Sequence, residues 1–306
     1  MGPELAKRLR QIIAVLLLLC ATSATAAPRV LVLGAVHDDP NEHYAALKPI
    51  ADYVATALAP TGIESVEIVI VPDRAQMLNL MRDGRIDWIS ETAFGAVHLV
   101  ERAGAEFLAR RWKDGTADYR SLFFARDDSN IETLDDLAGR TVAFEHRNST
   151  SAFFAPAVML GEQGLELHAM ASPREAPPPG RSGYVFSGAE YNTAVWVDKG
   201  IVDVGVLSES NWRDAETVPP AFIERFRVIA VSEPMPRAVE VVRGGLDADV
   251  ADALREALFA MHEDAAALQV LNAFEGTARF DALSDTDIDT LSRIREALPG
   301  FREQFP

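Results

Sequence analysis

Apolar runs of strand length alternate with amphipathic segments in the first part of the chain. The runs are "RVLVLGAV" (29–36), "SVEIVIVP" (65–72) and "IDWIS" (86–90). The segments between them, 41–58 and 74–84, repeat apolar residues every three or four positions, which is helical spacing. Strands that alternate with helices in this way predict an α/β fold with a mostly parallel sheet.

The alternation begins again near residue 118, after a polar stretch. Strands are expected at 121–128 and 226–236. Between them, residues 189–207 have the pattern of a helix, a turn at Gly200 and a further strand. From about residue 246 onwards the pattern is helical, and it shows no internal repeat.

We therefore predict two lobes, the second inserted in the first, with a hinged cleft between them. Residues 27–117 begin lobe 1, residues 118–231 form lobe 2, and residues 232–306 complete lobe 1 with a helical C-terminal segment that packs back on it. Crossing strands are expected near Asp118–Ser121 and near Ile229–Glu233. Open α/β sheets bind ligands at the carboxyl ends of their strands, so the cleft is the expected binding site.

Residues 1–26 have the organisation of a secretory signal peptide. Lys7, Arg8 and Arg10 precede an apolar run at 12–19, and the small residues at 24–26 form a cleavage site. The apolar run is too short to span a bilayer comfortably. We therefore expect export to the periplasm.

Cys20, the one cysteine of the chain, lies within this leader. It could be the lipid anchor of a lipoprotein, but Leu19 before it is larger than the residue that such cleavage prefers. Simple removal of the leader is the favoured interpretation. The mature chain would then contain no cysteine, which excludes disulfides and a thiol nucleophile.

The chain is strongly acidic, with 29 basic residues, 46 acidic residues and a formal net charge of −17. The leader is basic, so its removal makes the protein more acidic still. This balance argues against nucleic acid and against anionic membrane surfaces as partners. It does not exclude a small anion, because the local field at a helix terminus can differ in sign from the field of the whole chain.

A run of three hydroxyl residues stands out in "EHRNSTSAFFAPAVML" (145–160). Ser149, Thr150 and Ser151 come directly before an apolar run, which is typical of a helix start. Capping needs only one hydroxyl. The run therefore indicates either a well-capped helix or a turn that binds an anion through hydroxyl and amide groups.

Three other polar segments lie just after a predicted strand or just before a predicted helix: "SET" (90–92), "SGAEYN" (187–192) and "SES" (208–210). Together with the hydroxyl run they are expected to line the cleft. The predicted ligand-binding residues are Ser149, Thr150, Ser151, Ser90, Glu91, Thr92, Glu190, Tyr191, Glu209 and Ser210.

Three stretches together resemble the phosphate-, phosphite- and phosphonate-binding proteins of ABC importers, which are type II periplasmic solute-binding proteins. They are "DWISETAFGAV" (87–97), "IETLDDLAGRTVAFEHRNSTSAFFAPAVML" (131–160) and "FSGAEYNTAVWVDKGIVDVGV" (186–206). The resemblance covers nearly all of the mature chain in order. It implies that the hydroxyls and backbone amides at 149–151 hold phosphoryl oxygens, and that the partners are a small solute and an ABC permease.

The sequence departs from this family at three places near the expected ligand. Glu190 stands where the family commonly has a histidine, and Ile89 replaces a tyrosine seen in phosphonate binders, with Glu91 close behind. After the second crossing strand the family often has an acid that grips a ligand amine, whereas this chain has Arg237 and Ala238.

A carboxylate that faces a phosphate dianion would cost on the order of 1–4 kcal/mol at about 4 Å. Three explanations stay open. Glu91 or Glu190 is protonated and donates a hydrogen bond, the ligand carries positive charge or hydroxyls without a phosphoryl group, or the glutamates point away and cap helices. The sequence does not decide between them.

Metal and enzyme signatures are weak. His37, Asp38, Asp39 and His43 match no standard metal site, and a turn followed by a helix cap explains them better. The chain has no G-x-S-x-G elbow, no P-loop and no H-E-x-x-H pair. A hydrolase that used a serine of the hydroxyl run would have only His146 nearby as a base. We predict no metal, no cofactor and no enzymatic activity.

The preferred function is capture of a small oxyanion-containing solute by lobe closure, for delivery to an ABC permease. The second choice is a sensor that reports the same binding event to a membrane kinase or chemoreceptor, and the third is catalysis. A monomer is expected, and no nucleic acid partner.

Overall fold

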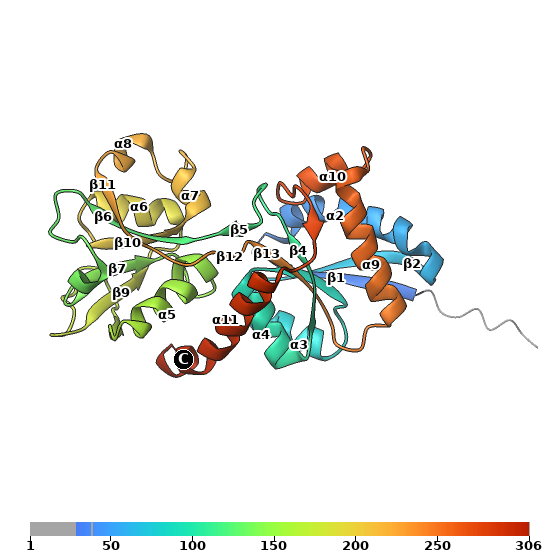
Figure 1. Ribbon diagram of the computed structural model, residues 1–306, viewed down its shortest axis with the longest axis horizontal. Helices are drawn as coiled ribbons and strands as arrows, with labels where there is room; N and C mark the ends of the chain where they lie inside the picture. The colour runs from blue at the N-terminus through green and yellow to red at the C-terminus, as the bar shows by residue number, and fades with distance from the viewer. Residues whose placement is uncertain (1–28, 38, 306) are drawn as a thin grey trace, which may run out of the picture.

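The computed structural model describes residues 29–37 and 39–305. The predicted signal peptide, with Cys20, lies outside the described residues, as does Asp38. The described chain forms two lobes that lie side by side along the long axis of the molecule (Figure 1). Each lobe contains one six-stranded sheet with helices against its faces, so the predicted α/β, two-lobed fold is confirmed.

The sheet of lobe 1 has the strand order β14-β4-β13-β3-β1-β2. Its strands are β1 (Arg29–Val36), β2 (Ile63–Val71), β3 (Trp88–Glu91), β4 (Glu106–Arg111), β13 (Ala238–Val242) and β14 (Phe280–Asp281). β1 pairs parallel with β2 and β3, as the alternating pattern predicts, while β13 lies antiparallel between β3 and β4. The sheet is therefore mixed. β13 belongs to the part of lobe 1 that follows lobe 2 in the sequence.

Both parts of the chain that form lobe 1 contribute helices. They are α2 (Pro40–Leu58), α3 (Arg74–Arg82), α4 (Ala93–Ala103), α9 (Ala248–Ala260), α10 (Leu268–Ala273) and α11 (Asp285–Gln304), with short 3₁₀ turns η1 (Ala59–Thr61) and η4 (Met261–Glu263). Among the described residues, no helix combines the length and the apolar character needed to span a bilayer.

The sheet of lobe 2 has the strand order β11-β6-β10-β7-β9-β8. Its strands are β6 (Ser121–Arg126), β7 (Thr141–Phe144), β8 (Leu167–Ala169), β9 (Ser182–Phe186), β10 (Val204–Ser208) and β11 (Phe226–Val231). Its helical segments are η2 (Leu134–Leu137), the π-type turn η3 (Thr150–Phe154), α5 (Ala155–Glu162), α6 (Glu190–Asp198), α7 (Glu209–Arg213) and α8 (Pro220–Ile223). The central strands are parallel, and β6 runs antiparallel to β10 and β11.

Two crossing segments join the lobes. β5 (Asp118–Tyr119) and β12 (Met235–Pro236) pair as a short antiparallel ribbon between the sheets (Figure 1). Just beyond it, the Ser121 amide donates to the Ser232 hydroxyl at 2.9 Å, and the Ser232 amide donates to the Ser121 carbonyl at 2.9 Å. β5 lies at the first expected crossing, whereas β12 lies a few residues beyond the second.

The C-terminal helix α11 reaches both lobes rather than packing back on lobe 1 alone. It contacts α4 of lobe 1 along its length and α5 of lobe 2 near its end (Figure 1). The rings of Phe301 and Phe305 lie 5.4 and 5.2 Å from that of Phe153 in lobe 2. Phe301 also lies 5.8 Å from Phe94 in lobe 1. An aromatic cluster therefore spans the two lobes on the side of the hinge where α4, α5 and α11 meet.

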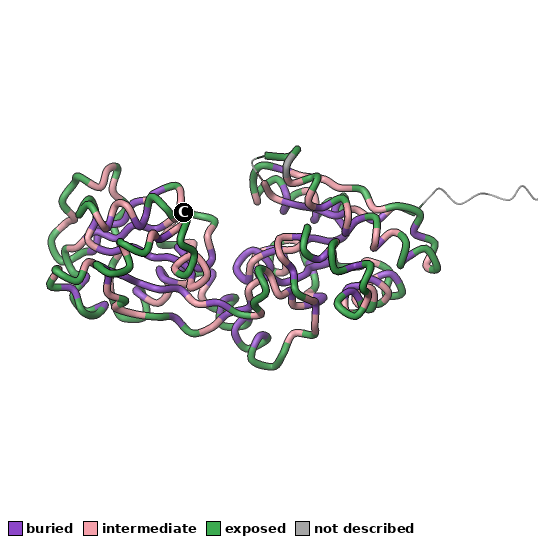
Figure 2. The backbone as a smooth tube through the Cα atoms, turned by 90° about the horizontal axis from the view of Figure 1, so that it is seen from above, coloured by how far each residue is buried: buried purple, intermediate pink, exposed green. Residues whose placement is uncertain are grey.

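The buried residues follow this arrangement (Figure 2). One apolar core fills the face of lobe 1 between its sheet and helices α2, α9 and α10, around Trp88 and Leu254. A second lies in lobe 2 between its sheet and α6, around Phe124 and Phe226. A third is shared by both lobes through α4, η3, α5 and α11. The shared core places the hydroxyl turn at the boundary between the lobes.

Candidate ligand-binding cleft

A cavity of about 660 Å³ opens between the lobes, mostly on the wall of lobe 1. Its lining residues are Ala35, Val36, His37, His43, Pro72, Arg74, Ser90, Glu91, Thr92, Arg111, Lys113, His146, Asn148, Gly188, Arg237, Ala238 and Glu275. Of the residues predicted from sequence, Ser90, Glu91 and Thr92 line this cavity. Lobe 2 contributes His146 and Asn148, which precede the hydroxyl run, and Gly188, which lies within the predicted segment 187–192.

The hydroxyl run forms a tight turn at the start of the helix. The Ser149 hydroxyl accepts a hydrogen bond from the Ala152 amide at 3.1 Å, as an N-cap residue does. Thr150 and Ser151 are buried, with 1% and 7% of their surfaces exposed. The next two residues, Phe153 and Phe154, enter the apolar core and hold the turn against the sheet. Capping thus accounts for Ser149 but not for the other two hydroxyls.

Thr150 faces the opposite lobe. Its hydroxyl donates to the Thr92 hydroxyl at 2.8 Å, and Thr92 is the residue that precedes α4 in lobe 1. The hydroxyl run at 149–151 and the segment 90–92 therefore meet across the lobe boundary. In this conformation the two hydroxyls are hydrogen-bonded to each other. Thr92 lines the cavity, whereas Thr150 and Ser151 are not among its lining residues.

Tyr119 of the hinge ribbon lies beside the same turn. Burial raises the pKa of the Tyr119 phenol, and the charge of Arg237 and hydrogen bonding with Ser151 and Thr150 oppose that rise. The guanidinium carbon of Arg237 lies 4.8 Å from the centre of the Tyr119 ring. The turn is therefore linked to the hinge and to a cation of lobe 1. Sequence reasoning missed Tyr119, because a two-residue strand leaves no periodic pattern.

Arg74 spans the cleft and neutralises Glu91. Asp73 caps α3 by accepting from the Gln76 amide at 2.8 Å, and this fixes Arg74 at the first helical position. Arg74 donates to the Asn148 carbonyl of lobe 2 at 2.7 Å and to the Glu91 carboxylate at 3.0 Å. Glu91 also accepts from the Thr92 amide at 3.1 Å. Glu91 is therefore an ion-paired support for Arg74 and Thr92, not an isolated carboxylate that would repel an anion.

Glu190 takes part in a different arrangement, at the start of α6. Burial and the neighbouring Glu145 raise the pKa of Glu190. His146 Nε2 lies 3.3 Å from Glu145 Oε1, and hydrogen bonding to Glu145 raises the pKa of His146. The backbone amide of Glu190 and the charge of His146 oppose the rise in the pKa of Glu190. Neither Glu190 nor Tyr191 lines the cavity, and Tyr191 is half exposed.

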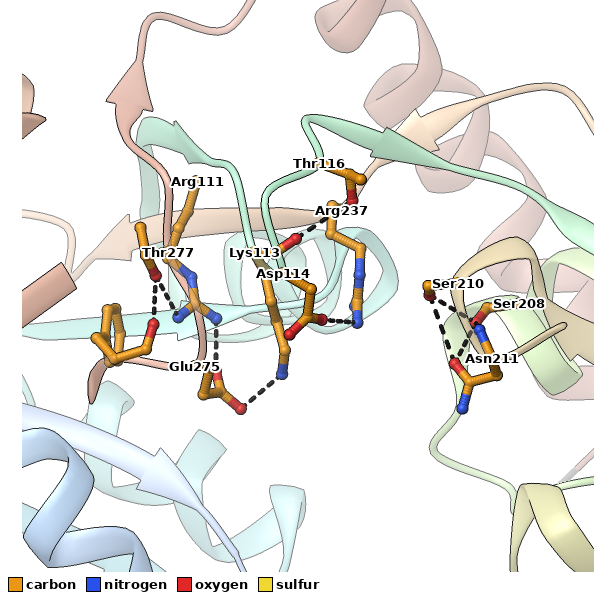
Figure 3. A network of polar contacts seen from close by, with 11 residues as sticks. Arg111, Lys113, Asp114, Thr116, Ser208, Ser210, Asn211, Arg237, Glu275 and Thr277 are labelled. Atoms are coloured by element: carbon orange, nitrogen blue, oxygen red, sulfur yellow. Dashed lines mark hydrogen bonds and ion pairs between the residues drawn. The ribbon is translucent and has the colours of Figure 1, made fainter. Parts of the chain in front are cut away.

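The segment at 208–210 also lies outside the cavity lining in this conformation. The hydroxyls of Ser208 and Ser210 are 2.9 Å apart, and the Asn211 amide donates to the Ser208 hydroxyl at 3.1 Å. Glu209 pairs instead with Arg213, at 2.5 Å. Figure 3 shows Ser208, Ser210 and Asn211 on lobe 2, to the right of Arg237 on lobe 1.

Lobe 1 presents a group of cations that the sequence analysis did not assign to the site. Arg111 and Lys113 both donate to Glu275, at 2.7 and 2.5 Å, and Arg237 donates to Asp114 at 2.8 Å (Figure 3). They come from the end of β4 and from the residue after β12. The sequence contained one indication of this group: Arg110, Arg111 and Lys113 lie shortly before the hinge in an otherwise acidic chain.

His37 and His43 stack on each other at the edge of this wall, with ring centres 4.4 Å apart. Both line the cavity. Burial lowers the pKa of His43, and the nearby charge of Glu275 opposes that effect. In the part of the chain that the structure describes, no cluster of three or more His, Cys, Asp or Glu side chains has a geometry that would hold a metal ion.

Comparison with known proteins identifies the family. The family model described as "ABC transporter, phosphonate, periplasmic substrate-binding protein" matches residues 33–288, which is most of the chain. The chain belongs to this family. The predicted recognition is thereby confirmed, and the family is a binding component of transporters rather than an enzyme. Its members are periplasmic, which agrees with the expected location, although the leader itself is not among the described residues.

Solved structures show how far the likeness extends. The XAC2383 protein of Xanthomonas citri has been solved with bound chloride and with bound ATP. The two structures are 37% and 36% identical to this chain, with TM-scores of 0.84 and 0.85, and each match covers 90% of this chain and 99% of that one. PhnD1 of Prochlorococcus marinus, in complex with methylphosphonate, has a TM-score of 0.63 over 89% of this chain and 99% of that one, but only 18% identity, so it shows the fold alone.

A curated relative is the phosphate-import protein PhnD of Mycolicibacterium smegmatis. It is 30% identical over 189 residues, which are 60% of this chain and 57% of the relative. The chain thus spans little more than half the length of that relative.

The cleft of this phosphonate-binding family member is positively charged although the protein is acidic. Four cations, Arg74, Arg111, Lys113 and Arg237, line the cavity against two carboxylates, Glu91 and Glu275. The formal net charge of the chain is −17. Cations are therefore gathered where the lobes face each other, and the local field there favours a small anion.

Proposed function

We propose that the protein is an extracytoplasmic solute-binding protein of an ABC importer that captures a small phosphoryl or phosphonyl compound by closure of its lobes. The observation that carries this proposal is the contact of Thr150 with Thr92 across the lobe boundary, beside Arg74. Hydroxyl donors from both lobes converge there on one point. The partners proposed are the solute and the membrane permease that receives it.

The proposed mechanism begins with an oxyanion that enters between Thr150 and Thr92. The Thr150 hydroxyl then donates to the ligand instead of to Thr92, and the Thr92 hydroxyl, which here accepts from Thr150 and Arg74, donates its own proton to the ligand. The amides of Thr150 and Ser151, at the first positions of the turn, have no acceptor within their own helix. Arg74 supplies charge from lobe 1 and already holds lobe 2 through the Asn148 carbonyl. Because the ligand accepts from donors of both lobes at once, it stabilises the forms in which the lobes are held together about the β5–β12 ribbon.

Calorimetry of the mature protein with phosphate, phosphite and methylphosphonate tests the proposal. Thr150→Ala removes one charge-assisted donor, so we expect affinity for the ligand that binds to fall about tenfold to a hundredfold. Thr150→Ser keeps the hydroxyl and is expected to retain most of the affinity. Thr56→Ala, on the exposed side of α2, is the matched control and leaves binding unchanged.

An unchanged affinity in a folded Thr150→Ala protein would show that the turn does not anchor the ligand. Thermal melting of each variant distinguishes that result from loss of the fold, since Thr150 is buried.

Phosphorylated nucleotides are a second candidate class of ligand. The XAC2383 protein, 36% identical to this chain, is solved with ATP. The cavity of about 660 Å³ lies within the range typical of sites for organic ligands, about 300–1,000 Å³. Inorganic phosphate alone would leave most of it to water. ATP therefore belongs in the same calorimetric series, and binding of ATP in preference to methylphosphonate would favour this second class.

A further inference from the structure

We propose that the cleft contains a second anion-binding subsite, formed by Lys113 and Arg237, and that the natural ligand carries two anionic groups. This inference rests on the proposed function, because the first anionic group is the one assigned to the hydroxyl turn. The second group would be a further phosphoryl or a carboxylate. Suitable compounds include diphosphates and phosphonocarboxylates.

The two cations have hydrogen-bond capacity that the protein does not use. An ammonium group has three donors, and among the described residues Lys113 uses one of them, toward Glu275 at 2.5 Å. The side chain of Arg237 donates only to Asp114 within the described chain, and its Nε is buried without a hydrogen-bond partner there. Both side chains line the cavity. An anion at this point would accept from donors that are already in place.

The surrounding charges also leave room for an anion. Arg111 pairs with two carboxylates, Glu275 and the fully buried Glu240, whereas Lys113 pairs with Glu275 alone. Asp114, the partner of Arg237, is half exposed. Burial lowers the pKa of Lys113, with Glu275 opposing the effect and Arg111 and Arg237 adding to it. Lys113 and Arg237 are therefore the cations of this wall that keep donors for a ligand anion.

The subsite is separate from the hydroxyl turn. Arg237 lies on the Tyr119 ring, and Tyr119 in turn lies beside Thr150 and Ser151. Lys113 is on the far side of Arg237 from lobe 2, close to Glu275 and Arg111 (Figure 3). Arg237 therefore lies near the hydroxyl turn, and Lys113 lies farther along the wall of lobe 1. A ligand with one small anionic group at the turn would leave Lys113 without an anion.

The chemistry of this wall excludes a ligand with a positive group at the same place. Arg237 follows directly after β12 and is followed by the uncharged Ala238. A ligand amine here would meet Arg237 and Lys113 and would be repelled. A negative ligand group is therefore preferred at this place.

A pair of matched ligands tests the inference. Methylphosphonate and phosphonoacetate share the phosphonate head, and phosphonoacetate adds one carboxylate. We expect the wild-type protein to bind phosphonoacetate at least about tenfold more tightly, as one additional charge-assisted contact provides. Lys113→Met is expected to abolish this preference while changing methylphosphonate affinity less than about threefold. Lys113→Arg keeps the charge and is expected to keep the preference.

Lys48→Met is the control, because Lys48 is an exposed lysine of α2 outside the cavity whose partner is Asp52. It should leave both affinities unchanged. Wild-type protein that binds both compounds equally, or Lys113→Met that weakens both alike, would overturn the second subsite but leave the proposed function standing. Failure of both compounds to bind would overturn the second subsite, and failure of phosphate, phosphite and ATP as well would overturn the proposed function. The wild-type comparison needs no variant, so the inference can fail even if Lys113→Met does not fold.

Discussion

At the scale of single residues, the support of the site depends on a glycine. Gly95 lies one helical turn after Glu91, and a Cβ at Gly95 would overlap the Glu91 carboxylate. Glu91 could then no longer hold Arg74 where it reaches lobe 2. The glycine is required for close approach, not for an unusual backbone angle.

Gly95→Ala is therefore expected to lower the free energy of unfolding by about 1–3 kcal/mol, as overpacking of a buried site does, and to weaken ligand binding through the loss of Arg74. Urea unfolding and calorimetry measure the two effects. Gly161→Ala is the matched control, since Gly161 is also helical, in α5, but has open space where the Cβ would go. That change should stabilise the protein by about 0.5–1 kcal/mol. Equal effects of the two substitutions would contradict the assignment.

The residues of the site were predictable only in part. Thr150 and Thr92 were predicted because local sequence marks helix starts and strand ends, and the structure brings their side chains into contact. Lys113 was not found, because its role depends on Glu275, which is distant in the sequence. Glu91 was named for its position, but the cation that neutralises it, Arg74, becomes its partner only through the packing of α3 against α4.

At the scale of elements, the contact between α4 and α11 includes a histidine that acid should disturb. His98 Nδ1 lies 3.2 Å from Arg302 Nη2, so a neutral His98 accepts from Arg302. Burial lowers the pKa of His98 from 6.5 to about 4, and three arginines add to the effect: Arg302, Arg102 and Arg74. Between those two pH values the unfolded chain binds the proton and the folded protein does not. This histidine therefore makes stability fall as the pH decreases from 6.5 to 4.

We expect His98→Gln to remove this contribution. Going from pH 7 to pH 5, the wild-type protein should lose about 1 kcal/mol more of its free energy of unfolding than His98→Gln does, after allowance for the partial exposure of the ring. Urea unfolding of both proteins at the two pH values gives the difference. Other titrating groups contribute alike to both proteins, so parallel losses would show that His98 is not responsible.

Elements with strong periodicity were predicted, and those formed by long-range pairing were not. The alternation through β1, α2 and β2 follows from local apolar spacing. The crossing at β5 was expected and the second crossing was placed a few residues before β12, but the pairing of the two as a ribbon was not predicted, because it exists only where distant segments meet at the hinge. The contact of α11 with lobe 2 was also missed, because its apolar stripe does not tell which lobe it covers. There, Phe301 meets Phe153 and Phe154.

At the scale of the whole molecule, two electrostatic fields of opposite sign act on an approaching anion. The chain as a whole carries a formal charge of −17, whereas the cavity lining has more cations than carboxylates. The Debye length is about 30 Å at 0.01 M ionic strength and about 8 Å at 0.15 M. At low salt the anion therefore meets the repulsion of the entire protein before it reaches the cleft, and at higher salt only the nearby cations act on it.

This arrangement predicts that the association rate constant of methylphosphonate rises, by about two- to fivefold, between 0.01 and 0.15 M ionic strength. An ordinary anion site in a neutral or basic protein would show the opposite trend, because screening there removes attraction. Stopped-flow tryptophan fluorescence measures the rate, with potassium glutamate as the salt, since chloride is itself a small anion that competes for such a site. An association rate constant that falls with added salt would contradict this prediction. It would mean that the field of the cleft extends beyond that of the acidic surface, so that the cations at the lobe boundary attract the ligand from a distance.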